Sequence, residues 1–144
     1  MVHALQESWR ALVPSGRLID LRPRATNWPL EVVVDGQVRL AGRVDNAPFV
    51  PDDSAAEGAM ERMVREGWFS LGQHTSFDCA SYWDTLEDML TYYRESTSPP
   101  LTFPDDVLAT AHAFTAPAGR DTKVRIRLSM ELSIYHKLAP EMQP

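Results

Sequence analysis

The sequence contains few residues in spacings typical of catalysis. Its four histidines, His3, His74, His112 and His136, are scattered, and none belongs to a His-x-x-x-His or Cys-x-x-Cys pattern, so we expect no metal site. His74 and Asp78 lie four residues apart on one expected strand and on the same face, which suits a proton-transfer pair. The other interpretation, which we favour, is a solvated or structurally hydrogen-bonded histidine.

The single cysteine gives no sign of reactivity. Cys79 follows Asp78 and has no basic neighbour in the sequence that would lower its pKa, so we expect a small buried apolar residue. One cysteine excludes an internal disulfide and fits a reducing, cytoplasmic setting. We therefore assign no catalytic residue and no cofactor, and enzymatic activity is not the favoured hypothesis.

Two sets of residues are candidates for binding. Arg22, Arg24, Arg125 and Arg127 lie on the first and last expected strands, which should be neighbours, and they form either an anion-binding patch or a solvated sheet face. Aromatic side chains gather in the middle third of the chain. Core packing explains most of them, and a surplus would line a pocket or an interface. The candidate pocket aromatics are Trp68, Phe77, Tyr82 and Trp83.

Composition is that of an ordinary globular domain. The 144 residues are 44% hydrophobic and 24% charged, so we expect one soluble domain spanning residues 1–144. The net charge of −6 disfavours a nucleic-acid partner, which would need clustered Lys and Arg. No apolar run is long enough for a signal peptide or a membrane span, so we expect no membrane association.

Local patterns predict an α+β protein. Its mostly antiparallel sheet of about five strands should have three to four helices packed on it, in the order α β β β α β α α β. The clearest turn signal is Asp35-Gly36 between two β-branched runs, typical of a two-residue hairpin turn. Ser81 to Asp84 resembles a capping box for the helix that follows. The expected helices cover about 3–12 and 53–66, with two more between residues 83 and 115, and the strands cover 17–22, 30–34, 37–41, 68–80 and 123–138.

The last strand shows the strongest periodicity. Apolar and polar residues alternate from Lys123 to Leu138, which predicts one face toward the core and one toward solvent. His136 alone interrupts the apolar series. The residues expected to face the core are Val124, Ile126, Leu128, Met130, Leu132, Ile134 and Leu138.

Residues 4–23 resemble the end of a class I S-adenosylmethionine-dependent methyltransferase domain. In that family a helix is followed by a Leu-x-Pro-Gly-Gly-x-Leu turn and an apolar strand, and here the chain reads Leu12-Val-Pro-Ser-Gly-Arg-Leu18, with Ser15 in place of the first glycine. The order of the later elements is also similar to the distal half of that fold. The resemblance implies that the last strand inserts antiparallel between its two predecessors.

The cofactor-binding half of that family has no counterpart here. The family binds its cofactor through a glycine-rich loop, and the seven glycines of this chain include no Gly-x-Gly pair. The chain therefore resembles a free-standing distal half, and we expect a methyltransferase-like domain without its own cofactor site.

Three functional hypotheses follow. The first is a non-enzymatic domain that acts by self-association, as a homodimer in the simplest case, or by binding a partner or small ligand. The second is a subunit of a split S-adenosylmethionine-dependent methyltransferase, completed by a protein partner that supplies the cofactor-binding half. The third is a protein with a small-ligand pocket between sheet and helices.

Overall fold

The structure is a computed structural model that describes residues 2–24, 26–98, 101–116 and 121–139. The described residues form an α+β fold with the predicted element order and a five-stranded antiparallel sheet. Its strands follow the order β1-β5-β2-β3, and β4 also pairs with β5. The chain groups into two compact units. Unit 1 comprises residues 1–24, 50–77 and 130–144, and unit 2 comprises residues 25–49 and 78–129.

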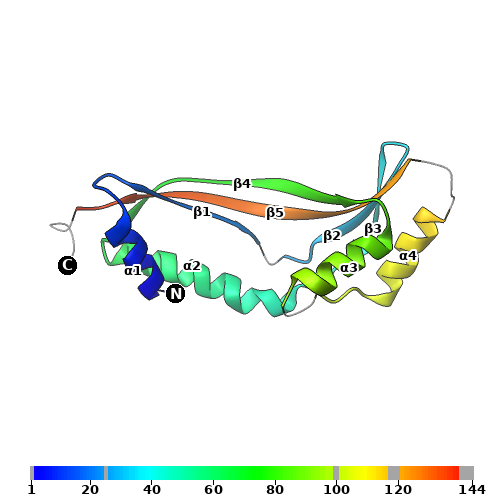
Figure 1. The fold of residues 1–144 in the computed structure, drawn as a ribbon, viewed down its shortest axis with the longest axis horizontal. Helices are drawn as coiled ribbons and strands as arrows, with labels where there is room; N and C mark the ends of the chain where they lie inside the picture. The colour runs from blue at the N-terminus through cyan, green and yellow to red at the C-terminus, as the bar shows by residue number, and fades with distance from the viewer. Residues whose placement is uncertain (1, 25, 99–100, 117–120, 140–144) are drawn as a thin grey trace. The chain divides into compact units, whose positions relative to one another are not determined.

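Unit 1 packs two helices against strands. It contains α1 (Val2–Ala11), β1 (Arg17–Pro23) and α2 (Val50–Arg65), with the first part of β4 (Phe69–Trp83) and the second part of β5 (Thr122–Lys137). Both helices lie on the same side of β1 (Figure 1). The core residues are Met60, Met63, Phe69 and Tyr135, with Trp9 and Trp68 packed edge to face beside them at 5.1 Å between ring centroids.

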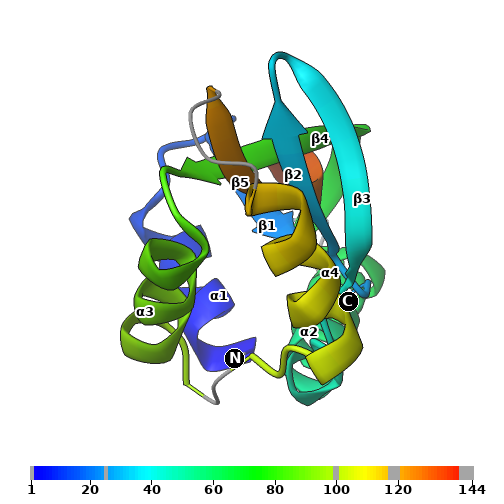
Figure 2. The same ribbon diagram turned by 90° about the vertical axis from the view of Figure 1, so that its right-hand side faces the viewer.

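Unit 2 is built on a hairpin. It contains β2 (Pro29–Val34), β3 (Gln37–Arg43), a short 3-10 helix (Ala47–Phe49), α3 (Leu86–Ser96) and α4 (Asp105–Thr115), with the remaining parts of β4 and β5. Asp35 and Gly36 both have positive φ, 51° and 77°, as the predicted turn requires. Figure 2 shows α4 beside the hairpin of β2 and β3. The core is centred on Leu30, Val32, Met89, Val124 and Ile126.

Two local predictions need correction. The capping box at Ser81 does not start a helix, because β4 continues to Trp83. The cap is Thr85, whose hydroxyl accepts a hydrogen bond from the backbone N–H of Asp88 at 3.1 Å. The pairing of β4 with β5 extends the strand beyond the point at which local signals place its end.

The second correction concerns which residues of β5 face a core. Val124 and Ile126 are fully buried and Leu128 packs on the core of unit 2, as predicted. In unit 1, however, Ser133 and Tyr135 are the buried positions of β5. Leu132 and Ile134 are half-buried and contribute to no core. The period-two pattern was correct, but the side facing the core of unit 1 was not the more apolar one.

Candidate functional site

Strand β1 has a free edge. Among the described residues it pairs only with β5, in a register that places Ile19 opposite Ile134 and Leu21 opposite Leu132. An unpaired edge presents backbone N–H and C=O groups that a further strand can bind. We call this surface, formed by Arg17–Pro23, the β1 edge.

The ladder with β5 fixes which backbone groups point to the free side. The carbonyl of Gly16 accepts a hydrogen bond from the N–H of Lys137 at 2.9 Å, so Gly16 faces β5. In an antiparallel ladder alternate residues share this orientation, so Leu18 and Asp20 also bond to β5. The N–H and C=O groups of Ile19 and Leu21 therefore point outward.

On the face turned away from the helices, the middle of the β1 edge is apolar. Ile19 is 63% exposed and Leu21 is 53% exposed. Both share that face with their half-buried partners Ile134 and Leu132 on β5. The result is an apolar strip that reaches the free edge, a feature that marks interaction surfaces more often than scattered apolar residues do.

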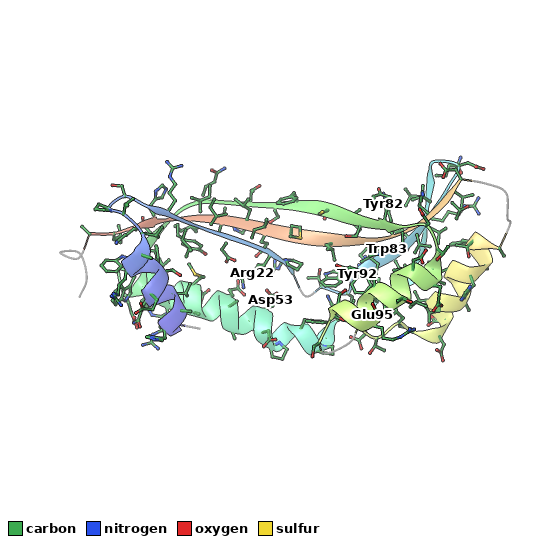
Figure 3. The ribbon with its side chains drawn as sticks, viewed as in Figure 1. Arg22, Asp53, Tyr82, Trp83, Tyr92 and Glu95 are labelled. Atoms are coloured by element: carbon green, nitrogen blue, oxygen red, sulfur yellow. The ribbon has the colours of Figure 1, made fainter. Side chains whose placement is uncertain are left out.

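The opposite face of β1 has Leu18 packed on the core of unit 1, followed by the charged residues Asp20 and Arg22. The guanidinium of Arg22 lies 3.3 Å from the carboxylate of Asp20 and 3.4 Å from that of Asp53, and it donates to the backbone carbonyl of Asp53 at 3.0 Å. Figure 3 shows Arg22 and Asp53 pointing toward one another from β1 and α2. Arg24 forms an ion pair with Glu131 at 3.1 Å. These pairs hold β1 against α2 and β5.

A hollow of about 200 Å³ adjoins the β1 edge on the helix side. Ile19 and Asp20 form its rim, and Leu5, Leu18, Ala56 and Met60 form the rest of its lining. The hollow is mainly apolar, so a side chain placed against the edge could fill it. A larger hollow of about 370 Å³ lies at the end of β5, beside Ser15 and Lys137.

The free sides of β3 and β4 are protected differently. β3 contains Arg39 and Arg43 and a register shift opposite Leu30 and Glu31, and charges and bulges both discourage strand pairing. On β4 most side chains between Leu71 and Cys79 are polar. β3 also exposes aliphatic side chains, Val38 at 48% and Leu40 at 55%, so the β1 edge differs from β3 by having no bulge and from β4 by its apolar strip.

The four predicted anion-patch arginines all have carboxylate partners. Arg22 and Arg24 belong to unit 1, with the partners given above, and Arg125 and Arg127 belong to unit 2. The two arginines of unit 2 both bind the buried Glu31, with N–O distances of 2.7 Å from Arg125 and 3.3 Å from Arg127. The patch as a binding site stays a prediction.

Further contacts hold the two arginines of unit 2 in place. Arg127 pairs with Asp78 at 2.7 Å, and Arg125 donates to the hydroxyl of Tyr82 at 2.9 Å. Hydrogen bonding to Asp78 and the charge of Glu31 raise the pKa of Arg127. Burial acts to lower the pKa of Arg125, but its bonds to Tyr82 and Glu31 outweigh this and raise it.

The four candidate pocket aromatics are divided between the units. Trp68 packs against the core of unit 1 and Phe77, in the same unit, is 43% exposed. In unit 2, Trp83 packs 5.5 Å from the rings of both Tyr92 and Tyr93, while Tyr82 is 54% exposed. Figure 3 shows Tyr82 and Trp83 on adjacent positions of β4. Their role in a pocket stays a prediction.

The residues considered for proton transfer have separate partners. Nδ1 of His74 lies 3.0 Å from the hydroxyl of the buried Ser133, whereas Asp78 binds Arg127. Cys79 is exposed, so its expected burial was wrong; β4 turns this side chain outward. His136 packs over Gly72, where a Cβ would lie 2.3 Å from its Nε2.

Comparisons of the chain with protein-family models, with curated proteins and with solved structures give no match. Within the described residues, no three His, Cys, Asp or Glu side chains are grouped to hold a metal ion. None of the helices in those same residues has the length and apolar character needed to cross a membrane.

Proposed function

We propose that this chain is an interaction domain that forms a homodimer by antiparallel pairing of the β1 edges of two copies. The observation behind the proposal is the outward orientation of the backbone groups of Ile19 and Leu21 next to their exposed side chains. A closed twofold dimer is the commonest homo-oligomer, and it satisfies the same edge on both copies.

The residues of β1 favour a twofold axis at Ile19. This register pairs Ile19 with its own copy and Arg17 with Leu21 of the second copy, so the outward groups form about six backbone hydrogen bonds. Leu18 lies opposite Asp20 of the second copy, next to the apolar hollow. Pro23, which has no N–H to donate, lies outside the paired segment.

Moving the twofold axis by one residue along β1 is less favourable. An axis at Asp20 would place the two Asp20 carboxylates directly opposite each other, and like charges in that position destabilise a sheet. The axis at Ile19 avoids any like-charge pair and joins the apolar strips of the two copies. The register is therefore part of the proposal.

The resemblance to a methyltransferase distal half supports the same surface. In the complete fold of that family, the strand similar to β1 is paired on both sides. A second copy would take the place of the missing neighbour. A partner chain with a cofactor-binding half would compete for the same edge, so a split methyltransferase is the alternative.

Light scattering behind a sizing column tests the assembly. We expect a mass near twice the chain mass of 16.2 kDa. For Ile19→Lys the mass should fall to 16.2 kDa, because the lysine of one copy would lie directly opposite the lysine of the second copy and the two charges would repel each other. Val38→Lys on β3, where Val38 is 48% exposed, is the matched control and should stay dimeric. A monomer of the unaltered chain at tens of micromolar would reject the homodimer.

Cysteine cross-linking tests the register. In a Cys79→Ser background, Ile19→Cys should form an intermolecular disulfide, because facing residues at the axis have Cα atoms about 5.5 Å apart. Leu21→Cys should not cross-link to its own copy. Efficient cross-linking at Leu21 alone, or at neither position in a proven dimer, would refute the axis at Ile19.

A further inference from the structure

A second binding site is indicated in unit 2, independent of the β1 edge. A polar hollow of about 110 Å³ lies where the start of β2, the end of β3 and the middle of β4 and β5 meet. The residues around it that matter here are Thr26, Arg43, Asp78, Arg127 and Ser129. Two guanidinium groups, two hydroxyl groups and one carboxylate thus border a space about the size of a small ion.

A β-bulge brings Arg43 to this hollow. In the β2–β3 pair, Arg39 lies opposite Val32, so both share the core-facing side of the hairpin. The register then shifts, and Arg43 lies opposite Pro29, on the side of Glu31. Without the extra residue in β3, Arg43 would share the face of Arg39. Bulges often redirect a side chain in this way near functional sites.

The hollow has unused hydrogen-bond donors. Arg43 donates one N–H to the backbone carbonyl of Asn27 at 2.9 Å, and it has no carboxylate partner among the described residues. A guanidinium has five N–H donors, so most of those of Arg43 are available. In the part of the chain that the structure describes, the hydroxyls of Thr26 and Ser129 have no hydrogen-bond partner either.

The charges around the hollow leave one positive charge uncompensated. Arg125 and Arg127 are balanced by Glu31 and Asp78, with N–O distances between 2.7 and 3.3 Å. Arg43 adds a further positive charge to this group. In a chain with a net charge of −6, this local excess favours an anion over a neutral ligand.

We propose that this hollow binds a phosphate group through Arg43, Arg127, Thr26 and Ser129. A tetrahedral oxyanion offers acceptor oxygens in several directions, which suits four donor groups at different places around one space. Guanidinium groups bind phosphate oxygens by paired, charge-assisted hydrogen bonds. The carboxylate of Asp78 repels the ligand and keeps the affinity modest.

The test is titration of the full chain with inorganic phosphate, followed by amide chemical shifts at constant ionic strength. Methyl phosphate in a parallel titration separates a phosphate ester from the free ion, and acetate is the carboxylate control. Arg43→Gln should weaken binding by about tenfold or more, as expected for loss of one charge-assisted contact. Arg39→Gln, on the same strand with its guanidinium over the Phe114 ring, should bind normally.

Asp78→Asn gives an effect of the opposite sign. Removing the like charge should tighten phosphate binding by about fivefold, the size expected for two charges about 4 Å apart in water. Saturable binding that is weakened by Arg43→Gln and strengthened by Asp78→Asn supports the site. No saturable shift up to 20 mM phosphate, unchanged binding in Arg43→Gln, or acetate binding as tightly as phosphate would overturn it.

Discussion

The close approach of Gly42 to helix α4 gives the sharpest test of the structure. A Cβ atom at Gly42 would lie 2.4 Å from Cγ2 and 2.9 Å from Cγ1 of Val107, which is buried in the core of unit 2. Carbon atoms in contact are normally about 3.5–4.0 Å apart, so helix or strand must move by about 1 Å. Valine has a stiff side chain and cannot rotate away. Gly42→Ala should therefore destabilise unit 2 by about 1–3 kcal/mol.

A double-mutant cycle separates this clash from other effects of alanine. Val107→Ala alone removes two buried methyl groups and should cost about 2 kcal/mol. In the double variant the two Cγ atoms that lie closest to the new methyl group are gone and only the Cβ of residue 107 is near, at 3.1 Å, so the total loss should also be about 2 kcal/mol. That is less than the sum of the single losses, by a coupling energy of about 1–3 kcal/mol.

Urea unfolding followed by circular dichroism and by tryptophan fluorescence, to which Trp28 and Trp83 of unit 2 contribute, measures these differences. Because Gly42 adjoins the bulge that redirects Arg43, phosphate binding should be weakened in Gly42→Ala and recovered in the double variant. A Gly42→Ala protein as stable as the original would refute the close approach. Additive losses in the double variant would show that Val107 is not the residue that clashes.

Two further predictions concern backbone strain and pH. Ser15 has φ of 63°, a left-handed conformation that glycine adopts more easily, so Ser15→Gly should raise the unfolding free energy by about 0.5–1 kcal/mol. The same change in the middle of α1, Ser8→Gly, should lower it, and a loss at both sites would contradict the strained turn. Burial, with a smaller contribution from Tyr92, raises the pKa of Tyr93 in the folded chain. The neutral Tyr93 side chain therefore stabilises the fold fully below the ordinary tyrosine pKa of about 10. This stabilisation is lost as the pH rises from there through the pKa of Tyr93 in the folded chain. Urea midpoints measured from pH 9 to 11 should therefore fall more steeply for the unaltered chain than for Tyr93→Phe, and parallel declines would refute this.

Local chemistry explains why the element order could be predicted. The Asp35-Gly36 turn needs two positive φ angles, and the sequence supplies residues that tolerate them. The first strand and its short turn were also predictable, because Pro14 to Gly16 interrupts the apolar pattern. These features depend on neighbours in the chain.

Features that depend on distant residues could not be predicted. The extension of β4 to Trp83 depends on pairing with β5, and the burial of Ser133 and Tyr135 depends on the helices of unit 1. Periodicity reveals that a strand has two faces, but not which one is covered when both contain large side chains. The bulge in β3 left only Gly42 as a signal, because a glycine within a strand often marks a bulge or a close approach.

The same limit applies to the candidate sites. Arg125 and Arg127 were identified from their alternation on one strand. Their joint partner Glu31 was not identified, because it is 94 residues away from Arg125 in the sequence. Arg43 was missed altogether, because the predicted strand ended at residue 41, two residues before the end of β3. The register shift alone gives it a place beside Arg127.

Differences among the strand edges also determine what kind of assembly is expected. If several edges were equally open, copies could pair through different edges and form an open array. Here a bulge and two arginines interrupt β3 despite its exposed Val38 and Leu40, and polar side chains cover most of β4, so among the described strands β1 is the apolar edge without a bulge. Pairing two β1 edges uses that edge on both copies and leaves no equivalent surface for a third. We therefore expect the assembly to stop at two chains as concentration rises, and masses that continue to increase would show that a second edge also pairs.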